Sequence, residues 1–188
     1  MKILTGFLRG RKLPLVPNPA LRPTADKVRK AVFDVFQGHV QGKRVLDLYS
    51  GTGAMGFEAL SQKAAFVRFV ERDRSQARHI EATLKRWRLT SSAAVNALDA
   101  LRMVDRLGLK KEIYDLVFID PPYGENLGSE TLKALSEAGL VGKGGFVVIE
   151  CGKREILPEK VADLSVVRDK KYGQSRLVIY RNGPGSVV

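Results

Sequence analysis

The chain has 188 residues and a hydrophobic fraction of 44%, which suits one globular domain with a sizeable core. It contains no apolar run of membrane-spanning length and no charged-then-apolar signal pattern at its start. Its single cysteine, Cys151, excludes an internal disulfide and a multi-cysteine metal site. We therefore expect a protein of the reducing cytoplasm. Cys151 itself is expected to be a small residue that fills space in the core.

The N-terminal quarter of the sequence is strongly basic. Residues 1–44 hold ten Lys or Arg against two Asp, which accounts for +8 of the formal net charge of +12. Such a concentration favours a polyanionic partner such as nucleic acid, although a merely solvated surface remains the alternative. The expected phosphate contacts are Arg9, Arg11, Lys12, Arg22 and Arg29.

The first elements in chain order are a hairpin, a connector and a helix. Two short β-prone runs in residues 2–15 are joined around Gly6, which predicts a β-hairpin. The proline-rich residues 16–23 form a connector, and Thr24 is the expected N-cap of a helix that reaches about Gln37. We therefore expect an N-terminal extension, residues 1–23, before a main domain of residues 24–188.

Beyond Gly42 the pattern alternates between strand and helix. The expected strands are 44–49, 65–70, 93–97, 114–120 and 145–150, and the expected helices are 54–62, 75–88, about 101–107 and 128–138. Two more strands are expected near 163–169 and 175–181. This alternation predicts an α/β fold with a doubly wound, mostly parallel sheet and an antiparallel C-terminal edge.

Ligands of such sheets bind where the strands end at their carboxyl edge. After the first strand, Gly51, Gly53 and Gly56 form a G-x-G-x-x-G loop, which permits a tight turn and a close backbone approach to a ligand. Both dinucleotide-binding and adenosylmethionine-binding folds use such a loop. Asp47, four residues before Gly51, favours a cofactor with a cationic amino-acid end over a pyrophosphate.

The next two strand ends also carry acids. Glu71 lies twenty residues after Gly51, where a carboxylate can accept hydrogen bonds from both ribose hydroxyls. A surface salt bridge with Arg72 or Arg74 is the alternative. Asp99 follows the third strand and is a candidate acceptor for an adenine amino group or an N-cap for the next helix.

The fourth strand ends in Asp120-Pro121-Pro122-Tyr123. Two prolines remove two N–H donors, so the turn offers mainly acceptors, namely the Asp120 side chain and nearby carbonyl oxygens. An acceptor-rich turn beside an aromatic face suits the planar amine of a nucleobase. Asp120 and the Pro121 carbonyl would hold the amino group, and Tyr123 would stack on the ring.

These motifs together resemble the RsmD family of class I S-adenosylmethionine-dependent methyltransferases, which modify the exocyclic N2 of a guanine in 16S ribosomal RNA. The resemblance rests on residues 10–36, 45–73 and 115–124 and covers essentially the whole chain. Tyr49 stands where phenylalanine is usual. The resemblance implies a Rossmann-like fold, a cytoplasmic monomer, no metal, and 16S rRNA as partner, either free or within the small ribosomal subunit or an assembly intermediate.

The resemblance also implies the site residues. The catalytic ones are Asp120, Pro121, Pro122 and Tyr123, and the cofactor-binding ones are Asp47, Tyr49, Ser50, Gly51, Gly53, Glu71, Arg72, Asp99, Ala100, Asp120, Arg22 and Thr24. Three alternatives remain open. One is an N-methyltransferase for adenine N6 or cytosine N4 in DNA or RNA. Another is a nicotinamide-dependent oxidoreductase, which leaves Asp47, the Asp-Pro-Pro-Tyr stretch and the basic N-terminus unexplained. The third is a non-catalytic RNA-binding module, which explains the charge but not the cofactor residues.

Overall fold

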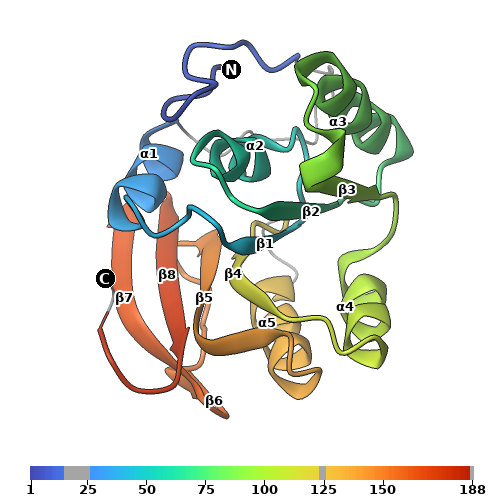
Figure 1. Ribbon diagram of the computed structural model, residues 1–188. Coiled ribbons are helices and arrows are strands. Elements are labelled where there is room, and N and C mark those ends of the chain that lie inside the picture. The colour runs from blue at the N-terminus through green and yellow to red at the C-terminus, as the bar shows by residue number, and fades with distance from the viewer. Residues whose placement is uncertain (15–25, 123–125, 187–188) are drawn as a thin grey trace.

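The computed structural model describes residues 1–14, 26–122 and 126–186. Its centre is one eight-stranded sheet with the order β3-β2-β1-β4-β5-β8-β7-β6 (Figure 1). Three of the residues predicted for the site, Arg22, Thr24 and Tyr123, lie outside the described residues, as does the predicted connector.

The observed elements follow the predicted alternation closely. The strands are β1 (Arg44–Leu48), β2 (Phe66–Val70), β3 (Ala93–Asn96), β4 (Tyr114–Ile119), β5 (Val141–Gly152), β6 (Lys160–Val161), β7 (Leu164–Tyr172) and β8 (Ser175–Asn182). The helices are α1 (Asp26–Val35), α2 (Ala54–Ser61), α3 (Arg74–Trp87), α4 (Ala100–Leu109) and α5 (Leu127–Glu137), with a 3₁₀ turn at Thr90–Ser92. Strands β1 to β5 pair in parallel, and β5, β8, β7 and β6 pair antiparallel, which confirms the predicted mixed sheet.

Helices cover both faces of the parallel part of the sheet. In Figure 1, α1, α2 and α3 lie on one side of the strands and α4 and α5 on the other. Alternate residues of each strand therefore enter different cores. Phe118, for example, packs in the cluster with α1 and α2, while its neighbour Ile119 packs in the cluster with α4 and α5.

Local sequence explains where α3 begins and ends. Asp73 caps α3 by accepting hydrogen bonds from the Ser75 and Gln76 amides at 2.7 and 3.1 Å, and α3 ends at Arg88 in a left-handed conformation. The predicted stripe on α3 is buried at Ala77, Ile80 and Leu84. No helix in the described part of the chain is long and apolar enough to cross a membrane.

The N-terminal segment, residues 1–14, differs from the predicted hairpin. It folds back on itself, and backbone hydrogen bonds join its two halves, from Ile3 to Arg11 at 3.0 Å and from Leu13 to Met1 at 3.1 Å, but only Lys2 and Lys12 form a β-bridge and there is no pair of regular strands. Tertiary contacts also hold the segment, because Ile3, Leu8 and Leu13 are buried in the core that contains α1 and α2. The two predicted strands are therefore not formed as regular strands, and the sequence analysis did not predict the contact with α2.

A buried acid on α2 fixes this segment. The Glu58 carboxylate accepts hydrogen bonds from the amides of Leu4 and Thr5 at 2.6 and 3.2 Å and from the Thr5 hydroxyl at 3.0 Å. It also pairs with the Arg29 guanidinium at 3.2 Å, and both side chains are fully buried. Glu58 thus joins the N-terminal segment, α1 and α2.

Arg29 corrects one of the sequence-based expectations. Its side chain has no exposed surface, and its remaining contacts go to the Lys2 carbonyl at 2.7 Å and to Asp26 at 3.0 Å. A guanidinium that is enclosed in this way does not reach an RNA phosphate. We therefore remove Arg29 from the predicted RNA contacts and assign it a structural role.

Candidate active site

The acids predicted for the site converge on one edge of the sheet. Asp47 lies on β1, Glu71 follows β2 and Asp120 follows β4, and these parallel strands are neighbours in the order β2-β1-β4. Between β1 and β4 the strand order reverses direction, which opens a crevice at the carboxyl edge of an open α/β sheet. The fold therefore brings the three carboxylates to the place where such sheets bind ligands.

The glycine loop that leads into α2 needs its glycines for conformation and space. Gly51 and Gly53 have φ values of 52° and 77°, in the left-handed region that favours glycine. A Cβ atom on Gly56 would lie 2.2 Å from the Phe69 ring, so only glycine lets α2 pack this closely on β2. The loop is a compact turn, closed by a hydrogen bond from the Gly53 amide to the Ser50 carbonyl at 2.7 Å.

Glu71 and Ser50 hold the ends of β1 and β2 together. The Glu71 carboxylate accepts hydrogen bonds from the amides of Gly51 and Asp73, both at 2.8 Å. The Ser50 hydroxyl donates to the Asp47 carbonyl at 2.7 Å and accepts from the Val70 amide at 3.0 Å. Glu71 is therefore not a surface acid, because it is only 8% exposed and faces the glycine loop.

Asp47 is a buried acid that prefers to keep its proton. It is 2% exposed and accepts a hydrogen bond from the Gly56 amide at 2.9 Å. Burial raises the pKa of the Asp47 carboxyl to about 8. The Gly56 amide opposes that rise, and the negative charges of Asp120 and Glu71 add to it. This cluster of carboxylates favours a cationic group over an anionic one.

The raised pKa of Asp47 makes a prediction about stability. The ordinary pKa of an aspartate is 3.8, whereas folded Asp47 keeps its proton up to about pH 8. Between these values the folded state binds more protons than the unfolded state, so Asp47 lowers the free energy of unfolding as pH rises. Asp47→Asn cannot ionise and should gain stability relative to the wild type across this range. Urea unfolding of both proteins at pH 5 and pH 8 checks this, and an equal difference at the two pH values would contradict it.

Tyr49 has a structural contact that the sequence did not suggest. Its backbone is left-handed, with φ 60°, and its hydroxyl lies 2.7 Å from the Thr131 hydroxyl on α5. Burial raises the pKa of Tyr49, while the Thr131 hydrogen bond opposes that rise. The Tyr49 hydroxyl therefore connects the end of β1 to α5.

Three further residues predicted to bind the cofactor show no contact that points to a ligand. Asp99 is the N-cap of α4 and accepts a hydrogen bond from the Arg102 amide at 3.2 Å, which is the capping role considered from the sequence. Ala100 is buried as the first residue of α4, and Arg72 is exposed. An adenine contact by Asp99 and cofactor binding by Ala100 and Arg72 stay predictions.

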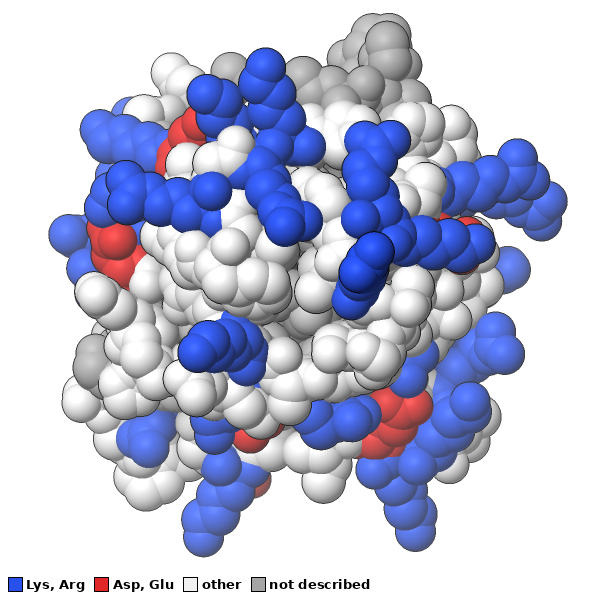
Figure 2. Space-filling model, turned by 45° about the horizontal axis from the view of Figure 1, so that its top comes forward, with Lys and Arg blue, Asp and Glu red and all other residues white. Residues whose placement is uncertain are grey.

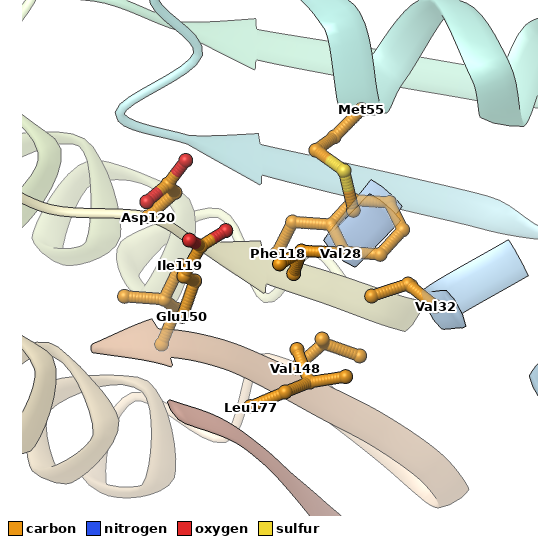
Figure 3. A pocket seen from close by; sticks show the side chains of 9 residues that line it. All are labelled: Val28, Val32, Met55, Phe118, Ile119, Asp120, Val148, Glu150 and Leu177. Atoms are coloured by element: carbon orange, nitrogen blue, oxygen red, sulfur yellow. The ribbon is translucent and has the colours of Figure 1, made fainter. Parts of the chain in front are cut away.

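Asp120 faces a small pocket together with an acid that the sequence analysis missed. The pocket lies between α1, α2 and strands β4, β5 and β8, and Figure 3 shows the Asp120 and Glu150 carboxylates at the same end of it. Pro121 is buried and Pro122 is exposed. Glu150 directly follows the apolar residues of β5. A charged residue at the end of such a strand could have suggested a functional role from the sequence, but only the pairing of β4 with β5 shows that Glu150 lies beside Asp120.

One face of the molecule is strongly basic. Figure 2 shows Lys and Arg side chains gathered over the top of the molecule, where the N-terminal segment and α3 lie (Figure 1). Arg11 connects these two elements, because its guanidinium lies 5.6 Å from the centre of the Trp87 ring at the end of α3. The exposed cations on α3 are Arg74, Arg78, Lys85 and Arg86.

The comparisons with known proteins agree with one another. A family model described as "Conserved hypothetical protein 95" matches residues 1–181. YlbH of Bacillus subtilis (strain 168) is 34% identical over 181 residues, which cover 96% of this chain and 98% of YlbH. Ribosomal RNA small subunit methyltransferase D of Escherichia coli (strain K12) is 32% identical over 181 residues, which cover 96% of this chain and 89% of that protein.

Solved structures share the fold over nearly the whole chain. The yhhF protein of Escherichia coli has a TM-score of 0.87 and 30% identity, and the match covers 98% of this chain and 99% of that one. The more distant SMU.776, solved in complex with SAH, has a TM-score of 0.62 and 16% identity over 82% of this chain and 48% of that one, so it shows the fold alone. With the family model matching residues 1–181, this chain belongs to the Conserved hypothetical protein 95 family, the RsmD-like methyltransferases.

Proposed function

We propose that the protein transfers a methyl group from S-adenosylmethionine to the exocyclic N2 amine of a guanine in 16S ribosomal RNA. The observation that carries this proposal is the position of Asp120-Pro121-Pro122, directly after β4 and next to the glycine loop and its acids. The relative in Escherichia coli that is named for the small ribosomal subunit supports the RNA substrate.

The acids at the sheet edge suit this cofactor. S-adenosylmethionine carries a positively charged sulfonium and ammonium, and it supplies the methyl group on a good leaving group. Asp47 would face the ammonium and Glu71 the ribose hydroxyls. A nicotinamide dinucleotide brings a negative pyrophosphate to the same loop, where the negative charges of Glu71 and Asp120 would oppose it.

Asp120 would act on the nucleophile. The lone pair of an exocyclic amine is delocalised into the base, so the nitrogen attacks poorly until it becomes more tetrahedral. Hydrogen bonds from the amine to the Asp120 carboxylate and the Pro121 carbonyl favour that geometry and stabilise the positive charge that develops. As the N–C bond forms, the C–S bond breaks with its electrons going to sulfur, and the nitrogen releases a proton to Asp120. Alignment of nitrogen, carbon and sulfur supplies the rest of the rate.

Glu71 provides a test of the cofactor site. Replacing Glu71 with alanine should weaken S-adenosylmethionine binding roughly tenfold or more, since each lost hydrogen bond to a charged acceptor costs about 1.5–3 kcal/mol. Loss of its bonds to the Gly51 and Asp73 amides loosens the loop and acts in the same direction. Calorimetry measures the affinity, with Glu81→Ala on the exposed face of α3 as control. Unchanged affinity in Glu71→Ala would remove Glu71 from the cofactor site.

The proposed RNA surface combines the N-terminal segment with α3. Arg74, Arg78 and Lys85 follow one another along one face of α3, opposite its buried stripe. No ion pair within the described residues involves these cations or those of residues 1–14, whereas other exposed cations are paired, as Lys30 is with Asp34. Cations without a carboxylate partner are available to phosphates.

The salt dependence of RNA binding tests this surface. Each lost phosphate contact reduces the slope of log affinity against log salt by about 0.7 to 0.9, so Arg9→Ala with Arg11→Ala should flatten it by roughly 1.4 to 1.8. The control is Lys110→Ala with Lys133→Ala, which removes the same charge from the C-terminal end of α4 and from α5, on the opposite side of the sheet. Affinity for 16S RNA is measured across a salt series. Equal slopes for the two double variants would show that Arg9 and Arg11 belong to a solvated surface only.

A direct assay tests the proposed activity. Purified protein is incubated with labelled S-adenosylmethionine and either free 16S RNA or small subunits from cells that lack the gene, and the RNA is digested to nucleosides. The expected product is N2-methylguanosine. Label in N6-methyladenosine or N4-methylcytidine would support the alternative substrates. Calorimetric binding of NADH without binding of S-adenosylmethionine would support the oxidoreductase.

A further inference from the structure

Glu150 lies next to Asp120 in the sheet. Strands β4 and β5 pair in parallel with Ile119 opposite Ile149, so the next residues, Asp120 and Glu150, follow at the same level. Both point to the same face as Phe118 and Val148, two residues earlier on each strand. Figure 3 shows the two carboxylates near one another at one end of the pocket.

The rest of the pocket wall is apolar. Besides the two acids and Ile119, its lining residues are Val28, Val32, Met55, Phe118, Val148 and Leu177. Glu150 is only 7% exposed, and burying a carboxylate beside apolar side chains is costly unless it serves a polar contact. An ionised carboxylate has about four acceptor sites, so Glu150 can accept a ligand hydrogen bond and keep its other contacts.

Two neighbouring acceptors fit the edge of only one amine-bearing base. Guanine presents two adjacent donors, the N1–H and the N2 amine. Adenine places an acceptor, N1, beside its N6 amine, and cytosine places an acceptor, N3, beside its N4 amine. A second carboxylate therefore attracts guanine, whereas it repels the ring nitrogen that adenine or cytosine would bring to the same place.

We propose that Glu150 is the residue that selects guanine, by accepting a hydrogen bond from N1–H while Asp120 accepts from the N2 amine. This inference rests on the proposed methyl transfer to guanine N2. It adds a specificity residue that acts on the ring and not on the reacting nitrogen. A site built to bond a particular donor rejects analogues that lack it, because the buried acceptor is then left without its partner.

The base analogue 2-aminopurine tests this role. It keeps the amine at C2, but its N1 is an acceptor instead of a donor. RNA fragments or reconstituted subunits are prepared with either guanine or 2-aminopurine at the methylated position. The wild type should prefer guanine by about 100-fold in kcat/KM, within the range of one good specific contact. Equal rates on both bases would overturn the assignment without any variant.

Glu150→Gln should then reverse the preference. Its amide can donate a hydrogen bond to N1 of 2-aminopurine and no longer offers a carboxylate to guanine. We expect kcat/KM for guanine to fall and that for 2-aminopurine to rise, while S-adenosylmethionine affinity stays the same. Glu137→Gln, an exposed change at the end of α5, is the matched control. A fall by the same factor on both bases would reduce Glu150 to a structural residue.

The failure of this inference differs from the failure of the proposed function. If the wild type methylates guanine and 2-aminopurine equally, the activity stands and the role of Glu150 is wrong. If the wild type instead methylates adenine or cytosine and leaves guanine unmodified, the proposed function itself is wrong, and the role of Glu150 falls with it.

Discussion

Replacing Asp120 with alanine is expected to lower the methyl-transfer rate by about 10²- to 10³-fold, the loss that is typical when one preorganised electrostatic group is removed from an active site. Cofactor affinity should fall far less, because the proposed role of Asp120 is to bind the amine and not the cofactor. Asp120→Asn keeps one acceptor oxygen and should retain more activity than Asp120→Ala. Single-turnover rates and S-adenosylmethionine titrations of each variant separate the two effects.

Asp105→Ala is the control for this experiment. Asp105 is an exposed acid on α4, away from the carboxyl edge of β4, and its removal changes the net charge by the same amount. It should leave both rate and affinity unchanged. Turnover of Asp120→Ala close to that of the wild type would contradict the assignment of Asp120 to the reacting amine.

Replacing Glu58 with alanine is expected to destabilise the fold by about 3–5 kcal/mol, the usual cost of removing one partner of a buried ion pair. The change leaves the guanidinium of Arg29 buried with only Asp26 as its ionic partner. It also removes the acceptor for the amides of Leu4 and Thr5, so the N-terminal segment should detach from α2. Urea unfolding measures the loss, and hydrogen exchange at the Leu4 and Thr5 amides reports the detachment.

Asp34→Ala provides the comparison for Glu58→Ala. Asp34 also pairs with a cation of α1, Lys30, but both side chains are exposed, at 52% and 63%. Exposed pairs contribute about 0–1 kcal/mol, so this variant should unfold almost like the wild type. Similar stability losses for the two variants would show that burial of the Glu58 pair is not what fixes the N-terminal segment.

The order of the elements was predictable because local pattern and tertiary environment agree along most of the chain. The stripe of Ala77, Ile80 and Leu84 faces the sheet in α3, as its spacing requires. Strand β5 begins earlier than its apolar run, at Val141. Its first residues pair with β4 before a shift in register, which the hydrophobic pattern does not reveal. The N-terminal segment does not form the regular strands of the predicted hairpin, and it is held by buried apolar residues and by Glu58 as well as by its own backbone hydrogen bonds.

Arg29 shows the limit of reading charge from sequence. Counting cations in residues 1–44 does not tell which of them lie inside the protein, and Arg29 directly follows the buried Val28 on α1. A signal was present in α2, whose one charged residue, Glu58, sits among apolar neighbours. A buried acid there requires a cationic partner, but the sequence does not say which of the ten basic residues in that region supplies it.

The candidate site was predictable where a motif specifies the local geometry. The glycine loop, Asp47, Glu71 and Asp120 each follow from a strand end and the residue type that stands there. Glu150 was missed because its importance depends on the pairing of β4 with β5, which is set by the whole fold. The part of α3 in the proposed RNA surface was missed for the same reason, because only the fold brings Arg11 of the N-terminal segment into contact with Trp87 at the end of α3.

Mass mapping of 16S ribosomal RNA tests the central claim most directly. RNA is compared from cells that lack this gene, from cells complemented with the wild-type gene, and from cells complemented with Asp120→Ala. We predict that one N2-methylguanosine disappears in the deletion strain, returns with the wild type and does not return with Asp120→Ala. An identical set of methylated guanines in all three strains, or the loss of a methylated adenine or cytosine instead, would contradict the proposed function.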